Sequence, residues 1–146
     1  EALFKKLGHN FTIKIDDNEP FEDNVLFCVA GNSRWYGGGF MAAPLAWPDD
    51  GKLDFVIVRL DRGRLRLASL LQKYKKGQHL GLPMTKYING SRLEIHSDVP
   101  AAVNIDGECE YVNDAVFEIV PKGIKFVVPQ FSEFHKNRAE REAARK

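Results

Sequence analysis

Three carboxylates gather around one glycine in the segment AVNIDGECEYV, residues 102–112. Asp106-Gly107 is a dipeptide typical of two-residue β-hairpin turns, and the apolar residues beside it alternate as they do in strands. Glu108 and Glu110 follow directly. A carboxylate carried on such a turn over a cleft could act as a general base, because it can accept a proton from a substrate within hydrogen-bonding distance. The alternative is an ordinary solvent-exposed turn.

A second acidic turn occurs in APLAWPDDGKLDF, residues 43–55. Asp49 or Asp50, together with main-chain carbonyl groups of the turn, would offer the oxygen ligands that Mg²⁺ prefers. The same residues are typical of a plain type I turn, which favours Pro followed by Asp and Gly. From the residues alone the plain turn is the better interpretation. The sequence does not contain the ligand positions of an EF-hand loop.

The histidines and cysteines do not have the spacing of a zinc site, because they lie far apart in the sequence. Cys28 and Cys109 occur in apolar or strand-like stretches. We expect two buried thiols in a reducing compartment, with a disulfide as the alternative. The glycines of WYGGGF, residues 35–40, lack the helix start and Lys-Ser/Thr pair of a phosphate-binding loop. They indicate a bulge or a close backbone approach.

Charge is distributed unevenly, although the formal net charge is only +1. The near-neutral total does not predict a nucleic-acid partner. Between residues 62 and 92, however, every charged residue is basic. This segment also contains an apolar helical pattern, so it could rest on the anionic head groups of a membrane, with a solvated helix surface as the alternative. The residues expected to face a membrane are Arg64, Arg66, Lys73, Lys75 and Lys76.

Strand patterns dominate the chain, whose 146 residues and 44% hydrophobic content suit one globular domain. Short apolar or alternating runs are separated by turn residues, which predicts a mainly β fold, either a sandwich or a barrel-like sheet. The predicted strands are residues 11–16, 24–31, 53–60, 85–90, 92–97, 101–105, 115–120 and 124–129.

The sequence predicts two helical segments. In residues 64–77 the apolar side chains recur at helical spacing, and Gly77 is well placed to end the helix; the apolar face consists of Leu67, Leu70, Leu71 and Tyr74. Residues 132–146 form a charged tail, expected to be a loose helix that projects into solvent or packs on something outside this chain. We therefore expect a globular domain over residues 1–131, followed by the tail. The sequence does not begin with Met, and we expect it to be a piece of a longer protein.

Taken in order, these motifs resemble the C-terminal domain of the diacylglycerol kinase and sphingosine kinase family, which includes bacterial lipid kinases. The matching segments cover nearly the whole chain apart from the charged tail. They are AGNSRWYGGGFMAAPLAWPDDGKLDF (30–55), LLQKYKKGQH (70–79), NIDGE (104–108) and EIVPKGIKFVVP (118–129). The resemblance implies a two-layer β-sandwich that carries a lipid site and faces an ATP-binding domain across a cleft. In the family that N-terminal domain carries a Gly-Gly-Asp-Gly-Thr motif, which this sequence lacks. The chain alone is therefore expected to be inactive.

The resemblance also implies roles for residues of both acidic turns. The catalytic base would be Glu108, Asp106 and Gly107 would shape its turn, and Glu110 would be an exposed strand residue. Bacterial members bind Mg²⁺ through an Asp carboxylate and two carbonyl groups. Transferred to this sequence, these ligands are Asp50 and the carbonyls of Trp47 and Lys52. ATP would be the co-substrate, held mainly by the N-terminal domain.

We therefore predict the substrate-side domain of an ATP-dependent lipid kinase that phosphorylates a hydroxyl of diacylglycerol or a related lipid. The protein would be cytoplasmic and would attach peripherally to membranes. One alternative is a non-catalytic β-sandwich that binds lipid or protein and uses residues 106–108 only as a hairpin. A second alternative is a domain like that of NAD kinase. The basic helical segment and its Gly-x-His ending favour a lipid over NAD.

Overall fold

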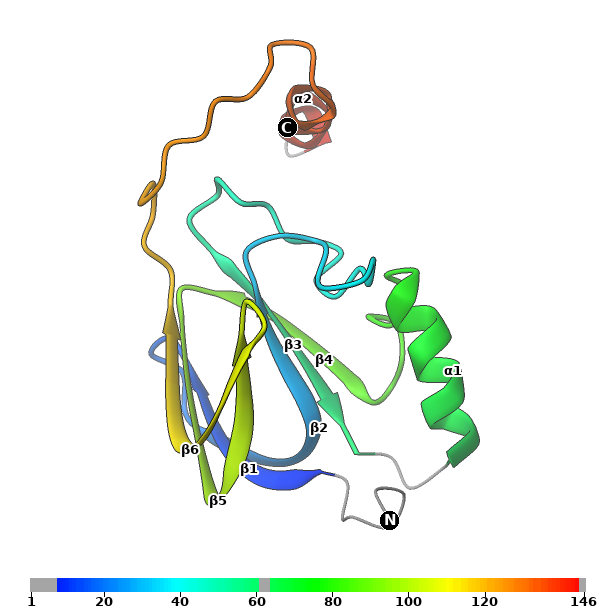
Figure 1. Ribbon diagram of the computed structural model, residues 1–146, viewed down its shortest axis with the longest axis vertical. Helices are drawn as coiled ribbons and strands as arrows, with labels where there is room; N and C mark the ends of the chain where they lie inside the picture. The colour runs from blue at the N-terminus through cyan, green and yellow to red at the C-terminus, as the bar shows by residue number, and fades with distance from the viewer. Residues whose placement is uncertain (1–7, 61–63, 145–146) are drawn as a thin grey trace.

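The computed structural model describes residues 8–60 and 64–144, and for residues 64–68 and 139–144 the backbone alone. The fold of these residues is mainly β, as the sequence predicts (Figure 1). The elements are β1 (His9–Ile15), β2 (Phe21–Gly31), β3 (Leu53–Arg59), α1 (Arg64–Lys75), β4 (Thr85–Gly90), β5 (Arg92–Ile105), β6 (Glu108–Glu118) and α2 (Glu133–Ala144).

A six-stranded antiparallel sheet has the order β4-β3-β2-β1-β5-β6. Three strands separate β4 from β5 in the sheet, yet in the chain only Ser91 joins them. Two peptide steps span at most about 7 Å. The sheet therefore has to curl until the end of β4 meets the start of β5. Its two halves, β4-β3-β2 and β1-β5-β6, face each other as the layers of a β-sandwich (Figure 1).

The space between the two layers holds the main hydrophobic core. Its side chains come from alternate positions of the strands, because successive residues of a strand point to opposite faces. Partly buried Ile88 of β4 and Phe117 of β6 pack against it, so that all six strands contribute. The buried members are Ile13, Ile15, Val25, Leu53, Phe55, Ile57 and Leu93.

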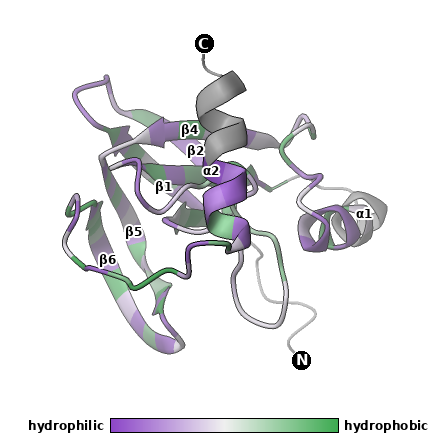
Figure 2. Cartoon of the chain, turned by 90° about the horizontal axis from the view of Figure 1, so that it is seen from above, coloured by the Kyte–Doolittle hydropathy of each residue, from purple (hydrophilic) through white to green (hydrophobic). Residues whose placement is uncertain are grey.

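The outer face of β3 is buried as well, which explains its continuous apolar run. Val56 and Val58 pack there against Leu70 of α1 and against Ala43 and Ala46 of the loop between β2 and β3. Figure 2 shows α1 to one side of the sheet. A strand covered on both faces loses the polar alternation of a half-exposed strand.

An acidic side chain holds the crossing at Ser91. Asp16 Oδ1 accepts hydrogen bonds from the backbone N–H groups of Ser91 (2.8 Å) and Arg92 (2.9 Å), and its own N–H donates to the Arg92 carbonyl (2.9 Å). Asp16 adopts a positive φ of 51°, which Asp tolerates better than most residues. Lys52 also donates from Nζ to the Ser91 hydroxyl at 2.8 Å. The crossing is therefore fixed by both its backbone and its side chain.

The long hairpin of β5 and β6 folds back on itself. The pairing between the two strands is regular from Arg92 to His96, is interrupted, and resumes after residue 100. Twelve residues of straight strand would carry the chain about 40 Å from Arg92, to the far end of the sheet. Asn104 instead accepts a hydrogen bond from Tyr36, in the loop that leaves the sheet where β5 begins. Figure 1 shows the chain descending along the first part of β5 and rising again to the yellow turn at its tip.

Some predicted strands need correction. Residues 92–97 and 101–105 belong to one interrupted strand, and β6 begins at Glu108, well before the predicted start at residue 115. Residues 124–129 form no strand: the chain beyond β6 runs as an extended connection to α2 (Figure 1). An alternating pattern becomes a strand only where a neighbour offers hydrogen bonds. The exposed apolar side chains of this connection are Val120, Ile124, Phe126, Val127 and Phe131.

The apolar face of α1 is buried only in part, and the expectation of two buried thiols is wrong for Cys109. On α1, Leu70 is buried and Tyr74 is half-buried, but Leu71 is 57% exposed because the helix touches the sheet along a narrow stripe. The side chain of Leu67 lies outside the described residues. Both cysteines are free, and Cys28 is half-buried, where burial raises its thiol pKa to about 12. Cys109 is exposed, two positions beyond the hairpin turn.

The end of α1 matches its prediction. Gly77 has a φ of 69°, and its N–H donates to the carbonyl of Tyr74 at 3.2 Å. The N–H of Gln78 donates to the carbonyl of Lys73 at 2.8 Å. This pair of bonds is a Schellman motif, which satisfies the last carbonyl groups of a helix.

Gly90→Ala should destabilise the domain. A methyl group at Gly90 would meet Asp16 Oδ2 at 2.8 Å, Ile15 Cγ2 at 2.9 Å and Phe55 Cε2 at 3.1 Å. We expect a loss of about 1–3 kcal/mol in the free energy of unfolding, measured by urea denaturation. Gly81→Ala is the matched control, because nothing lies within 4 Å of the added atom. Equal stability of the two variants would contradict close packing at the crossing.

Candidate functional site

The turn between β5 and β6 presents Glu108 to solvent. Ile105 pairs with Glu108 across the hairpin, so that Asp106 and Gly107 are the only residues of the turn. Their φ angles are 50° and 101°, the left-handed combination that matches the twist of a two-residue hairpin. The N–H of Gly107 donates to Asn104 Oδ1 at 3.3 Å. Asp106 and Gly107 thus shape the turn as predicted, and Glu110 is exposed on β6.

The glycine-rich loop contacts this turn. Tyr36 and Phe40 form a bridge that closes the loop around Gly38 and Gly39, both at positive φ. The hydroxyl of Tyr36 donates to Asn104 Oδ1, the same atom that accepts the Gly107 N–H. Sequence reasoning missed this role of Tyr36, although its residue type and its place beside the glycines were visible.

Asn104 is a second residue that sequence reasoning missed. Its carbonyl oxygen joins the glycine-rich loop to the turn, and its Nδ2 donates to Cys109 Sγ at 2.9 Å. It stands at the first position of the motif NIDGE, which was its available signal. The side chain therefore braces the two ends of the turn against the neighbouring loop.

The predicted metal ligands lie on one tight turn. The N–H of Asp50 donates to the Trp47 carbonyl at 3.4 Å, and the N–H of Lys52 donates to Asp50 Oδ1 at 3.0 Å. Gly51, with a φ of 73°, allows the reversal between them. The turn thus holds one carboxylate and two carbonyl groups within six residues, a donor set suited to a hard cation. In the described part of the chain, no three side chains of His, Cys, Asp or Glu form a metal cluster.

The charged tail packs on this turn, so the expectation that it would project into solvent or pack on something outside this chain is wrong. The ring of Phe134, at the start of α2, stacks on Trp47 with centroids 5.2 Å apart. Arg138 forms an ion pair with Asp49 at 3.1 Å. Asp49 therefore has a partner in α2, and Asp50 has one in the N–H of Lys52.

A small cavity lies beside this contact. The guanidinium of Arg34 lies 5.5 Å from the centre of the Trp47 ring. The cavity is lined by Ser33, Arg34, Trp35, Ala46, Trp47, Pro48, Phe134 and Asn137. Its volume of about 210 Å³ is below the roughly 300–1,000 Å³ of ordinary ligand pockets. The cavity is therefore not by itself a lipid site.

A buried histidine connects the end of α1 to the loop between β2 and β3. His79 is fully buried, its Nε2 lies 3.1 Å from the Ala42 carbonyl, and its ring packs against Tyr74 with centroids 4.7 Å apart. Burial lowers the pKa of His79 more than its hydrogen bonds raise it. The imidazole is therefore neutral near pH 7 and belongs to the packing.

The predicted membrane residues lie on or next to α1. Lys73, Lys75 and Lys76 are exposed near its C-terminal end. Arg64 and Arg66 lie in its first turn, but their side chains are outside the described residues. Exposed apolar side chains on α1 and in the loop before β3 are Leu71, Trp35, Tyr36 and Leu45.

A family model described as the YegS C-terminal NAD kinase beta sandwich-like domain matches residues 2–128. This chain belongs to that family. It resembles a "Probable lipid kinase YegS-like" of Shewanella frigidimarina (strain NCIMB 400), with 27% identity over 113 residues, 77% of this chain and 36% of that protein. A diacylglycerol kinase of Mycobacterium tuberculosis (strain CDC 1551 / Oshkosh) is 27% identical over 121 residues, 82% of this chain and 38% of that protein.

The fold is shared with solved structures. A crystal structure of a diacylglycerol kinase from Bacillus anthracis str. Sterne superposes with a TM-score of 0.57 and 17% identity, over 82% of this chain and 43% of that chain. The chain spans little more than a third of the length of the curated relatives it matches. These findings confirm the resemblance seen in the sequence, and the names of the relatives support a kinase-related domain.

Proposed function

We propose that this YegS-type domain is the substrate side of an ATP-dependent lipid kinase, with Glu108 as the general base. One observation carries the proposal: Glu108 stands exposed beside a two-residue turn that Asn104 and Tyr36 tie to the glycine-rich loop. Family membership supports kinase chemistry. The ATP site is assigned to a domain outside this chain, because the curated relatives are almost three times as long as the matched region.

The proposed reaction is an in-line phosphoryl transfer. The oxygen of the lipid hydroxyl forms a bond to the γ-phosphorus of ATP, the bond from that phosphorus to the β–γ bridging oxygen breaks, and ADP leaves. The hydroxyl proton passes to the carboxylate of Glu108. A rigid turn suits this role, because a base has to be held within hydrogen-bonding distance of the proton that it accepts.

We also propose Mg²⁺ as the cation of the Asp50 turn. The carboxylate of Asp50 and the carbonyls of Trp47 and Lys52 would hold it, and the hydrogen bonds within the turn keep these groups together. When bound, the ion would stiffen the loop and place positive charge at the edge that faces the nucleotide domain. Lys52 already links this loop to Ser91.

The third part of the proposal is peripheral attachment to a membrane. Lys73, Lys75 and Lys76 are exposed close to Leu71 on α1, which combines positive charge with apolar surface. Among the described residues, no helix has both the length and the apolar character needed to cross a bilayer. In this proposal α1 rests on the membrane surface, from which the domain would take its lipid substrate.

Glu108→Gln should lower phosphoryl transfer to diacylglycerol in the full-length protein by about 10²- to 10⁴-fold, because the amide cannot take up the proton. The assay follows labelled γ-phosphate, with NAD as a second acceptor. Glu110→Gln is the matched control, since this residue is exposed two positions further along β6. A near-normal rate for Glu108→Gln would exclude it as the base, and transfer to NAD alone would favour a nucleotide kinase.

Mg²⁺ should stabilise the wild-type protein but not Asp50→Asn. At a concentration 100 times the Kd, bound Mg²⁺ should add about 2.7 kcal/mol of stability, measured as a rise in Tm between EDTA and MgCl₂. Asn retains an acceptor for the Lys52 N–H but lacks the charge. Asp49→Asn should keep the rise in Tm with MgCl₂. The assignment is wrong if Asp49→Asn loses this rise and Asp50→Asn keeps it.

Replacing Lys73, Lys75 and Lys76 together by Gln should weaken binding to vesicles that contain anionic lipid. Each lysine near the surface contributes about 1 kcal/mol, so we expect a loss of about 100-fold in affinity, and wild-type binding should fall as salt is added. The control replaces the exposed Lys122, Lys125 and Lys136 instead. Docking through α1 would be refuted if vesicle binding did not change with salt, or if both triple variants lost the same amount of affinity.

A further inference from the structure

The position of Glu108 depends on the fold in the β5–β6 hairpin. Without that fold, the turn would lie at the far end of the sheet from the glycine-rich loop that contacts it. The interruption in strand pairing falls between His96 and Ala101, and such bulges bend strands locally. We call residues 96–100 with their β6 partners the elbow. Whatever fixes the elbow also fixes the approach of the turn to Tyr36.

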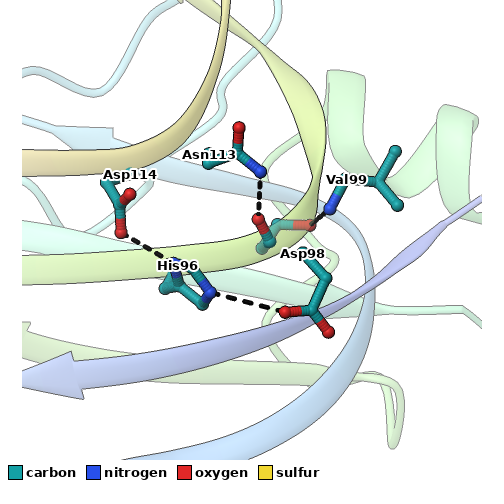
Figure 3. A network of polar contacts seen from close by, with 6 residues as sticks. His96, Asp98, Val99, Asn113 and Asp114 are labelled. Carbon is teal, nitrogen blue, oxygen red and sulfur yellow. Dashed lines mark hydrogen bonds and ion pairs between the residues drawn. The ribbon is translucent and has the colours of Figure 1, made fainter.

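Two backbone contacts fix the inner side of the elbow (Figure 3). Ser97 is only 3% exposed, and its carbonyl accepts a hydrogen bond from Asn113 Nδ2 at 2.7 Å. Its hydroxyl oxygen accepts the N–H of Val99 at 3.4 Å. These contacts turn the chain at Ser97 and attach it to β6.

The outer side of the elbow is held by a histidine between two carboxylates. His96 Nδ1 lies 2.7 Å from Asp114 Oδ1 on β6, and its Nε2 lies 3.6 Å from Asp98 Oδ1 in the elbow (Figure 3). Two ring nitrogens that each face a carboxylate can both donate only when the imidazole is protonated. The neutral ring has one donor, so one of the two contacts must then be given up.

Other charged groups on this face do not replace the two aspartates. Thr12 is the residue of β1 opposite His96, so β1 offers no charge there. The remaining charged groups on this face up to the elbow are Arg92 and Glu94 on β5, Glu118 on β6, Lys14 on β1 and Glu22 on β2. Arg92 pairs with Glu94 at 3.3 Å and with Glu118 at 3.8 Å, Lys14 lies opposite Glu94, and Glu22 lies opposite Thr12.

We propose that His96, Asp98 and Asp114 form a protonation-dependent clasp that holds the elbow and thereby positions the turn that carries Glu108. They are positioning residues. The protonated ring contacts both Asp98 and Asp114, and loss of its proton releases one of these two carboxylates. This inference rests on the proposed function of Glu108. The proposed response to pH therefore arises at His96, and not at the carboxylate of Glu108.

The expected pH range follows from the contacts of the ring. The hydrogen bond to Asp114, assisted by Asp98, raises the pKa of His96 above the ordinary value of 6.5, and desolvation offsets this only in part. A raised pKa in the folded protein means that the clasp contributes fully below pH 6.5. Its contribution is lost as the pH rises through the raised pKa.

The test records the amide signal of Gly107 in ¹⁵N-glycine-labelled full-length protein as the pH is raised from 5 to 9. Gly107 donates to Asn104 at the turn, and its signal should shift with the same midpoint as the His96 ring. His96→Gln should abolish this shift, and Asp114→Asn should move its midpoint to lower pH. His135→Gln, at an exposed histidine on α2, should leave it unchanged. A Gly107 signal that ignores the titration of His96 would overturn the clasp.

Kinetics supply a second readout. The kcat of His96→Gln should fall below wild type by up to about 5-fold at low pH, where the wild-type clasp is closed, because the three side chains are exposed and exposed ion pairs are weak. The two rates should converge above the pKa of His96. A deficit that is equal at all pH values would indicate a purely structural role and would refute the proposal. The NMR measurement on Gly107 does not require the protein to be active. If Glu108→Gln stays active while Gly107 still follows His96, the clasp stands and the proposed base falls.

Discussion

Ser91 is the whole connection between β4 and β5, and three other strands lie between these two in the sheet. That single residue forces the sheet to close on itself, and Asp16 makes the closure stable by accepting two consecutive backbone N–H groups. A carboxylate that accepts several backbone bonds is among the stronger hydrogen-bonding groups of a protein. The crossing thus fixes the two layers between which the core packs.

The same crossing places the candidate site. Lys52 reaches Ser91 with its ammonium group, so the acidic turn of Asp50 is attached where the layers join. The glycine-rich loop leaves the sheet at this end, and the folded hairpin returns its tip to it through Asn104 and Tyr36. The β2–β3 connection, which contains both the glycine-rich loop and the Asp50 turn, thus meets the tip of the β5–β6 hairpin at one end of the sandwich.

The sequence predicted what local patterns can encode. Periodicity located the strands of the core, and the Asp-Gly dipeptide predicted the hairpin turn that the structure contains. The C-terminal end of α1 followed from Gly77 alone, because a positive φ at that position leaves few alternatives to glycine. Family motifs then pointed to Glu108, which is exposed beside the turn and whose role as a base stays a prediction.

Long-range arrangements could not be read in this way. Nothing in residues 92–105 distinguishes two strands from one bent strand, because the bend depends on contacts that Asn113 and Asp114 supply from β6. Residues 124–129 have a strand pattern but no neighbouring strand in the described structure. The contact of Phe134 with Trp47 joins residues that lie far apart in the sequence, and no local pattern predicts it.

The two thiols of this domain differ sharply in environment. Burial keeps Cys28 protonated, with a pKa of about 12, whereas Cys109 is exposed and adjoins Glu108. Alkylating reagents react with thiolates, so a maleimide dye at neutral pH should attach almost entirely to Cys109. The wild-type chain therefore already contains a single attachment point for a fluorescent or spin reporter at the turn, without any engineered cysteine.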